Sequence, residues 1–206
     1  MPLGARLYDG PMTSAPSADA SAAPRSLWLA PVLRAVPALI VGLSITFIAD
    51  HSALIGLIML GAFGLATAAV LVLTDVRMRR GEPLKLLHRG LAVITGIAGL
   101  LALAVVATTT TAGLGMLVLL VGGFAVLAGG LELVWGIRHR DRSALARDAV
   151  VIGAGTLALA VVLAFVGDPV SAVGFFGAYA VVLGVFLVIA GLSARWSTQL
   201  KEHTAS

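Results

Sequence analysis

Six long apolar stretches dominate this sequence and limit what the chain can fold into. A helix that crosses the hydrocarbon layer of a membrane needs about 20 mostly apolar residues. Stretches close to or above that length lie at 35–49, 53–74, 90–107, 113–137, 149–167 and 170–192. Hydrocarbon offers the backbone no hydrogen-bond partners, so continuous helices are expected rather than open strands. The sequence therefore predicts an all-α membrane protein with six transmembrane helices.

The composition supports lipid as the main solvent. Of the 206 residues, 59% are hydrophobic and only 12% are charged, whereas an ordinary soluble domain is roughly 25% charged. A soluble protein of this size would lack the polar residues to cover its surface. The chain also has no cysteine, which excludes disulfides, thiolate metal sites and cysteine nucleophiles.

Short connections join the spans in pairs. They lie at 50–52, 108–112 and 168–169, so the spans they join are expected to be antiparallel neighbours in three helical hairpins. The first span can extend back to Leu29 if Arg34 reaches the interface with its guanidinium group. Residues 1–26 are rich in Ala, Ser and Pro and are predicted to be a disordered tail. The membrane domain would cover 27–196, followed by a short tail at 197–206.

The basic residues predict the orientation. None of the 14 Lys and Arg residues lies in the three short connections. Because short basic segments stay on the cytoplasmic side, both termini and the two longer loops are predicted to be cytoplasmic. Six residues at this edge are predicted to anchor the helices at the interface: Trp28, Trp135, Trp196, Arg34, Arg89 and Arg147. The net charge of +4 is thus explained by the topology, and nucleic-acid binding is not needed to explain it. Membrane lipids are the expected partners.

An internal repeat is visible in the even-numbered spans. Span 113–137 and span 170–192 carry glycines in one register, 55 residues apart: Gly122, Gly129 and Gly136 match Gly177, Gly184 and Gly191. Span 53–74 follows more weakly. Each odd span begins after a basic residue and carries a glycine further in, at Gly42, Gly96 and Gly153. The pattern predicts one hairpin repeated three times, at about 27–80, 81–142 and 143–196, with parallel copies around an axis along the membrane normal.

The repeated glycines have a direct physical use. Steps of seven residues are about two helical turns, so each set lies on one helix face. Small residues let helices in lipid approach closely and gain van der Waals contact. A helix-packing seam is therefore favoured over the alternative, a glycine-lined pore or substrate path.

The repeat also carries a family resemblance. The motif Gly-x-Phe/Tyr-x4-Gly-x6-Gly-Ile/Leu closes even spans and an arginine begins odd ones, most clearly in FFGAYAVVLGVFLVIAGL at 175–192. This tripled hairpin resembles the HdeD family of small bacterial acid-resistance membrane proteins. The resemblance implies a multi-pass protein of the cytoplasmic membrane linked to acid stress, and it supplies no catalytic residues.

Glu132 is the one acid inside the six stretches. It lies about 7.5 Å from the cytoplasmic end of its span, where it is a candidate proton-relay group or an ion-pair partner of His88, Arg89, Arg138 or Arg140. The aligned position in span 170–192 is Leu187, so a symmetric relay is not expected.

No catalytic, cofactor or metal site is predicted. The four histidines, at positions 51, 88, 139 and 203, are assigned to loops, edges or the tail, and none has the i,i+4 partner of a helical metal site. The leading hypothesis is a non-enzymatic HdeD-type protein that assists acid or envelope stress tolerance. The alternative is a small transporter or channel, proton-coupled through Glu132. For both hypotheses the sequence leaves open the substrate and the oligomeric state, and a homo-oligomer is one of the alternatives.

Overall fold

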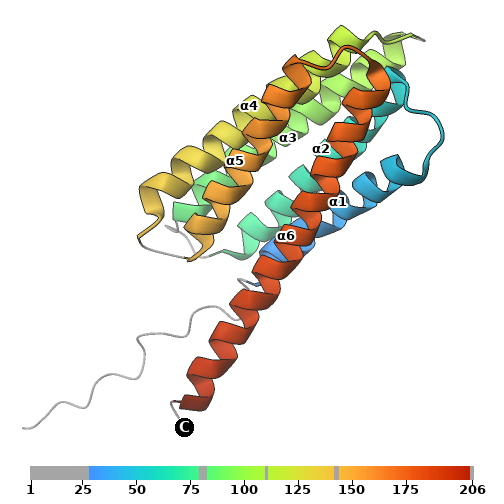
Figure 1. Cartoon of the computed structure of the whole chain (residues 1–206). Coiled ribbons are helices and arrows are strands. Elements are labelled where there is room, and N and C mark those ends of the chain that lie inside the picture. Colours follow the sequence, from blue (N-terminus) through green and yellow to red (C-terminus); the bar gives the residue numbers. More distant parts are fainter. Residues whose placement is uncertain (1–27, 79–82, 110, 142–143, 205–206) are drawn as a thin grey trace, which may run out of the picture.

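The chain folds into a bundle of six helices (Figure 1). A computed structural model describes residues 28–78, 83–109, 111–141 and 144–204. The helices are α1 (Leu29–Phe47), α2 (Ala53–Arg77), α3 (Pro83–Thr108), α4 (Leu114–His139), α5 (Ala144–Ala164) and α6 (Pro169–Thr204). All six are long and apolar enough to cross a membrane. The prediction of an all-helical chain with six spans is confirmed at this level of length and composition.

Several helices extend beyond the apolar stretches. Helix α1 begins at Leu29 and α3 at Pro83, where the missing N–H of proline suits a first helical turn. Helix α6 continues to Thr204, through most of the segment expected as a short tail, and projects past the rest of the bundle (Figure 1). Polar residues can continue a helix outside hydrocarbon, so apolar length underestimates these helices. The predicted tail at 1–26 lies outside the described residues.

The two ends of the bundle differ in chemistry. Helices α1, α3 and α5 begin, and α2 and α4 end, at one end, here called the basic end because its segments carry the Lys and Arg residues. At the opposite, distal end, Ser52 caps α2 by accepting a hydrogen bond from the Ile55 N–H at 3.4 Å. Asp168 caps α6 by accepting from the Ser171 N–H at 2.8 Å, a bond that holds the pKa of Asp168 below its usual value. These caps let short connections begin new helices.

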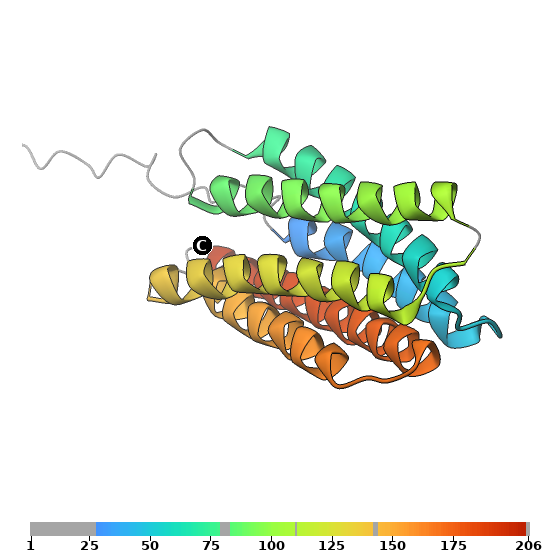
Figure 2. The same cartoon turned by 90° about the horizontal axis from the view of Figure 1, so that it is seen from above.

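The most extensive helix contacts join α2 to α3, α4 to α5 and α1 to α6. The two views show these pairs lying side by side (Figures 1 and 2). The pairs expected from the hairpins, α1–α2, α3–α4 and α5–α6, also touch, but less extensively. Each even helix therefore packs mainly against an odd helix that the predicted repeat assigns to a different copy.

Glycines make each close pair possible. A Cβ on Gly153 of α5 would lie 2.7 Å from the Gly129 carbonyl oxygen of α4. One on Gly64 of α2 would lie 2.9 Å from the Gly99 Cα of α3, and one on Gly42 of α1 would lie 3.0 Å from the Gly177 carbonyl oxygen of α6. Such distances are below van der Waals contact, so only glycine allows these backbones to approach so closely. We call these three contacts the glycine seams.

Most of the predicted seam glycines lie in such contacts. Added Cβ atoms at five of them would meet the neighbouring helix at 3.0 Å or less: Gly129, Gly136, Gly177, Gly184 and Gly191. The prediction for Gly122 was wrong, because no atom lies within 4 Å of a Cβ placed there. The same seven-residue steps keep Gly177, Gly184 and Gly191 of α6 all in contact with α1, so the difference at Gly122 is the lack of a neighbouring helix close to it, not its place on the helix face.

The seam contact of α3 runs through Gly99, which the repeat pattern does not single out. A Cβ on Gly99 would lie 3.0 Å from the Leu65 nitrogen of α2, whereas one on Gly96 would meet only the Ala68 Cβ at 3.5 Å, an ordinary contact.

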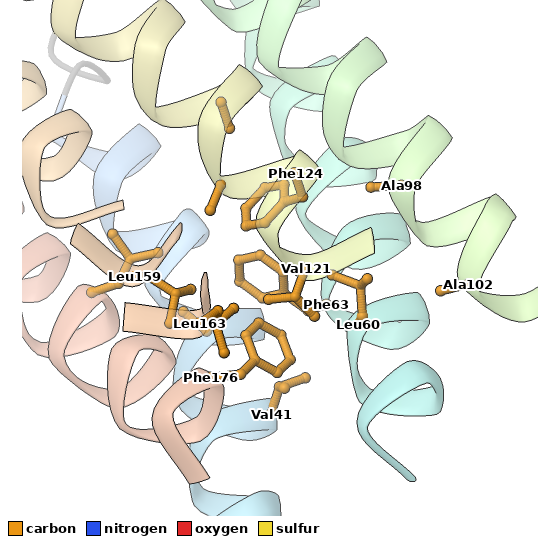
Figure 3. Close-up of a cluster of buried hydrophobic side chains, with 14 of the residues drawn as sticks. Val41, Leu60, Phe63, Ala98, Ala102, Val121, Phe124, Leu159, Leu163 and Phe176 are labelled. Atoms are coloured by element: carbon orange, nitrogen blue, oxygen red, sulfur yellow. The ribbon is translucent and has the colours of Figure 1, made fainter. Parts of the chain in front are cut away.

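Helices α2, α4 and α6 also meet at the centre of the bundle. The Phe63 ring packs edge-to-face against Phe124 at 5.7 Å and against Phe176 at 5.9 Å between centroids (Figure 3). Buried Leu60 and Val121 surround these rings. Aromatic and aliphatic side chains thus fill the axis here, and glycines do not line it.

The outer surface of the bundle is apolar. Large exposed side chains occur near the distal end, such as Phe47 and Phe165, and near the basic end, such as Val76 and Leu86. A protein in water rarely exposes so much contiguous apolar surface, whereas a bundle in lipid requires it.

The seams predict opposite effects for two glycine substitutions. Gly153→Ala is expected to lower the melting temperature of the full chain in lipid nanodiscs by several degrees, because its Cβ would meet the Leu133 nitrogen at 2.5 Å. The matched control, Gly122→Ala, adds its methyl group in open space and favours the helix, so it should leave the melting temperature unchanged or raise it. Equal losses for both variants would contradict the seam.

Candidate functional site

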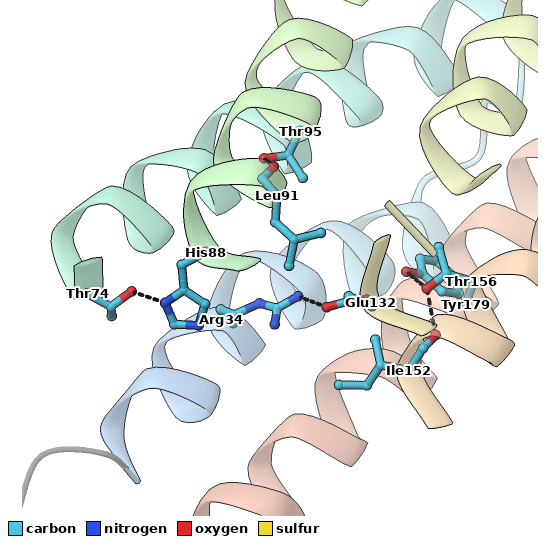
Figure 4. A network of polar contacts seen from close by, with 9 residues as sticks. All are labelled: Arg34, Thr74, His88, Leu91, Thr95, Glu132, Ile152, Thr156 and Tyr179. Atoms are coloured by element: carbon cyan, nitrogen blue, oxygen red, sulfur yellow. Dashed lines mark hydrogen bonds and ion pairs between the residues drawn. The ribbon is translucent and has the colours of Figure 1, made fainter. Parts of the chain in front are cut away.

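A buried ion pair lies inside the bundle near its basic end. Arg34 of α1 donates from Nη2 to the Glu132 Oε1 of α4 at 2.8 Å (Figure 4). The two side chains are only 13% and 4% exposed. Helices α1 and α4 are not neighbours in the bundle, so the pair depends on the length of the arginine side chain, which crosses the space between them.

Arg34 differs from its predicted role: it was expected to anchor α1 at the interface, but its guanidinium group points into the bundle instead. Glu132 forms an ion pair, one of its two expected roles, but not with His88, Arg89, Arg138 or Arg140; its partner Arg34 is 98 residues away. An unpaired buried carboxylate is so costly that even a distant guanidinium group is favoured as a partner.

The other arginines and one tryptophan predicted as anchors lie on the surface. Arg89 is 62% exposed and pairs with Asp75 at 3.1 Å. Arg147 is exposed near the start of α5, and Trp196 is exposed on α6. All lie at or beyond the basic end, where lipid headgroups border a bundle that spans a membrane.

The remaining two tryptophans are held by neighbouring side chains. The Arg195 guanidinium group lies 5.1 Å from the centre of the Trp28 ring, a cation–π contact between α6 and the start of α1. Trp135 stacks on His139, one turn later in α4, with centroids 4.7 Å apart. An interfacial role for the three tryptophans stays a prediction.

A cavity of about 50 Å³ adjoins the ion pair. Arg34, Glu132, His88 and Asp148 supply its ionisable groups, and its other walls are apolar. A single water needs about 10–15 Å³ of such space, so this cavity can hold several waters. Ala30 and Leu84, from the first turns of α1 and α3, line its side toward the basic end.

Two further ionisable residues line this cavity: His88, which the sequence suggested as a partner of Glu132, and Asp148, which the sequence analysis did not single out. His88 was assigned to a loop or edge, but it lies in α3, is only 4% exposed, and has Nδ1 3.5 Å from the Thr74 hydroxyl. Asp148 is a half-buried acid one turn into α5. Asp148 gave no distinct signal in the sequence, because an acid just before an apolar stretch ordinarily faces water at the end of a span.

A second, smaller cavity of about 10 Å³ lies deeper along the axis. Arg34, Glu132 and Leu187 line both cavities, so the ion pair forms part of the wall between them. Thr67, Thr95 and Tyr179 bring hydroxyl groups to the smaller cavity, which Phe63 and Phe124 also line. The Tyr179 hydroxyl is hydrogen-bonded to the Thr156 hydroxyl at 2.9 Å (Figure 4).

These groups are suited to exchanging protons and forming hydrogen bonds. Two carboxylates, a histidine, an arginine and several hydroxyls lie around two neighbouring cavities. Among the described residues, no group of three His, Cys, Asp or Glu side chains could hold a metal ion.

Comparison with known proteins identifies no relative. No family model, no curated protein and no solved structure matches this chain. The six apolar helices nevertheless define the class, that of multi-pass helical membrane proteins.

The ion pair can be tested through stability. Removing either partner, by Arg34→Met or Glu132→Leu, is expected to lower the free energy of unfolding by about 3–5 kcal/mol, because an uncompensated charge stays buried. The double variant, which replaces both charges with apolar groups, should recover most of that loss. Unfolding of the full chain in detergent micelles would measure all three.

The matched control is the pair formed by Asp75 and Arg89 at the same end of the bundle. Asp75 is itself only 13% exposed, but Arg89 is 62% exposed and stays hydrated when it loses its partner, so Asp75→Asn should cost about 1 kcal/mol or less. Additive losses in the Arg34–Glu132 double variant would show that the two charges do not depend on each other.

Proposed function

We propose that this chain is a small transport protein of the cytoplasmic membrane, coupled to protons through Glu132. One observation carries this: the Arg34–Glu132 ion pair is buried between two polar cavities inside an apolar helical bundle. Ionisable groups inside a membrane are costly and mark ion pathways or proton relays. Here both charges face the interior of the bundle, and neither faces the lipid.

The equivalent position in α6 favours a functional role for Glu132 over a purely structural one. In the register of the repeated glycines, Glu132 corresponds to Leu187 of α6, which is also buried. A leucine thus suffices for packing at the equivalent place. An apolar pair of similar volume is often as stable as a buried ion pair, so packing alone gives no reason for the two charges.

The arrangement suggests how coupling works. Protonation of Glu132 cancels its charge and releases Arg34 to another acceptor, and Asp148 lies on the wall of the same cavity. The larger cavity supplies protons from the basic end. Phe63, Phe124 and Phe176 close the axis on the distal side, so this conformation corresponds to a state closed toward that side.

An HdeD-type role in acid or envelope stress tolerance, without enzymatic activity, is the second candidate. It is supported by the repeated glycine motif of α4 and α6 and by the three extensive pairs α1–α6, α2–α3 and α4–α5, each of which contains one even and one odd helix. A protein that senses or moves protons would serve such a role, so the two candidates are compatible.

Transport can be measured as proton uptake in proteoliposomes that contain the full chain. An imposed pH gradient should drive uptake above that of protein-free vesicles, and Glu132→Gln should reduce it to that background because the amide does not titrate. Asp75→Asn serves as the control, since it removes a carboxylate at the same end but outside both cavities. Unchanged uptake in Glu132→Gln, or no uptake with the unmodified chain, would exclude the proposal.

The proposed orientation has both termini in the cytoplasm. In this cysteine-free chain, Gly167→Cys would place a thiol at the exposed distal end, and Asp141→Cys would place one at the exposed basic end. An impermeant maleimide added to intact cells should label only the first, and inside-out vesicles should expose the second. The reverse pattern would overturn the orientation.

A further inference from the structure

The smaller cavity contains two buried polar atoms without a protein partner. Among the described residues, Thr67 Oγ1 and Arg34 Nε are buried and make no hydrogen bond, and both residues line this cavity. Thr67 is only 4% exposed. Leaving such groups unpaired in an apolar interior is unfavourable for folding.

Other threonines in the same bundle avoid this cost. The hydroxyls of Thr74, Thr95 and Thr156 each donate to a backbone carbonyl one turn earlier in their own helices, at 2.8–3.0 Å. That bond is the usual solution for a threonine inside a membrane helix. Thr67 does not make it, so its hydroxyl remains available to the cavity.

The size of the space restricts what can pair with these atoms. At about 10 Å³, the cavity is close to the 10–15 Å³ that one water requires. An organic solute or a hydrated ion would not fit.

We propose that the smaller cavity is a binding site for one water molecule, held between the Thr67 hydroxyl and the Arg34 Nε–H. The water oxygen accepts from Nε–H, which leaves both of its protons for acceptors. The Thr67 oxygen, the Glu132 carboxylate and the Tyr179 hydroxyl all belong to residues that line the cavity. The water thus gains the two to four partners that buried waters normally have.

This site extends the polar groups beyond the ion pair. The water lies on the far side of Arg34 and Glu132 from the larger cavity and adjoins the Tyr179–Thr156 hydrogen bond. The inference does not depend on transport, because it rests on unpaired atoms and cavity size in the resting bundle.

Thr67→Val tests the proposal by the sign of its effect on stability. Valine has nearly the same shape without the hydroxyl, so if Thr67 is simply unpaired the variant should melt at a higher temperature. If a water bridges Thr67 and Arg34, the variant leaves the water short of a partner, and the full chain in nanodiscs should melt about 2–4 °C lower.

Thr95→Val is the matched control at the wall of the same cavity, because the Thr95 hydroxyl is already bonded to the Leu91 carbonyl. The fall in melting temperature of Thr95→Val measures the effect of removing a hydroxyl that already has a hydrogen-bond partner. A fall for Thr67→Val at least as large as that for Thr95→Val supports the water site. A smaller fall, no change or a rise overturns it.

A density map of the unmodified chain in nanodiscs, at a resolution that shows ordered waters, tests the site without any substitution. Density for one water within about 3.2 Å of both Thr67 Oγ1 and Arg34 Nε supports the proposal. A map that shows other ordered waters but none at this position overturns it. Because neither experiment measures proton movement, the water site and the transport function can fail separately.

Discussion

Helices surrounded by hydrocarbon gain little from burying apolar side chains against one another, so this fold depends on how closely their backbones can approach. Gly129 and Gly153, Gly64 and Gly99, and Gly42 and Gly177 bring three pairs of helices together. Each seam lies between the two helices of one pair, away from the centre of the bundle. The centre is therefore available to larger side chains, aromatic toward the distal end and charged toward the basic end.

The buried ion pair depends on this arrangement. Arg34 is carried by α1, which the glycine contacts hold against α6, and Glu132 is carried by α4, which is held against α5. Neither seam joins α1 to α4, so the two charges meet across a space that the seams define but do not fill. Cavities remain on both sides of the pair because the long arginine side chain bridges that space without closing it.

Much of the fold could be predicted because membrane spans leave a strong one-dimensional signal. The six apolar stretches gave the number of helices, and the glycine register located contacts such as those of Gly136 and Gly184. Helix ends were less predictable, since α3 and α6 continue into polar sequence. The lack of a neighbour at Gly122 depends on how the helices pack in three dimensions, which the repeat does not show.

The site was only half predictable. Glu132 could be identified because an acid within an apolar span is unusual in itself. Its partner could not, because Arg34 and His88 lie near span edges, where a basic residue ordinarily faces water or headgroups. Whether such a side chain turns inward depends on which helices surround it, and those helices come from distant parts of the sequence. Thr67 gave no signal at all, because a threonine in a membrane helix usually satisfies its own hydroxyl.

The pairing of α1 with α6 has a consequence for biosynthesis. Helix α1 is synthesised before α2 to α5, yet its most extensive contacts are with α6, so Gly42 cannot meet Gly177 until the four helices between them have been made. Arg34 likewise enters the membrane long before Glu132 is synthesised. Until α4 is inserted, the Arg34 guanidinium group has no Glu132 to pair with and needs another partner, such as water or a lipid headgroup. The bundle is complete only when α6 packs against α1.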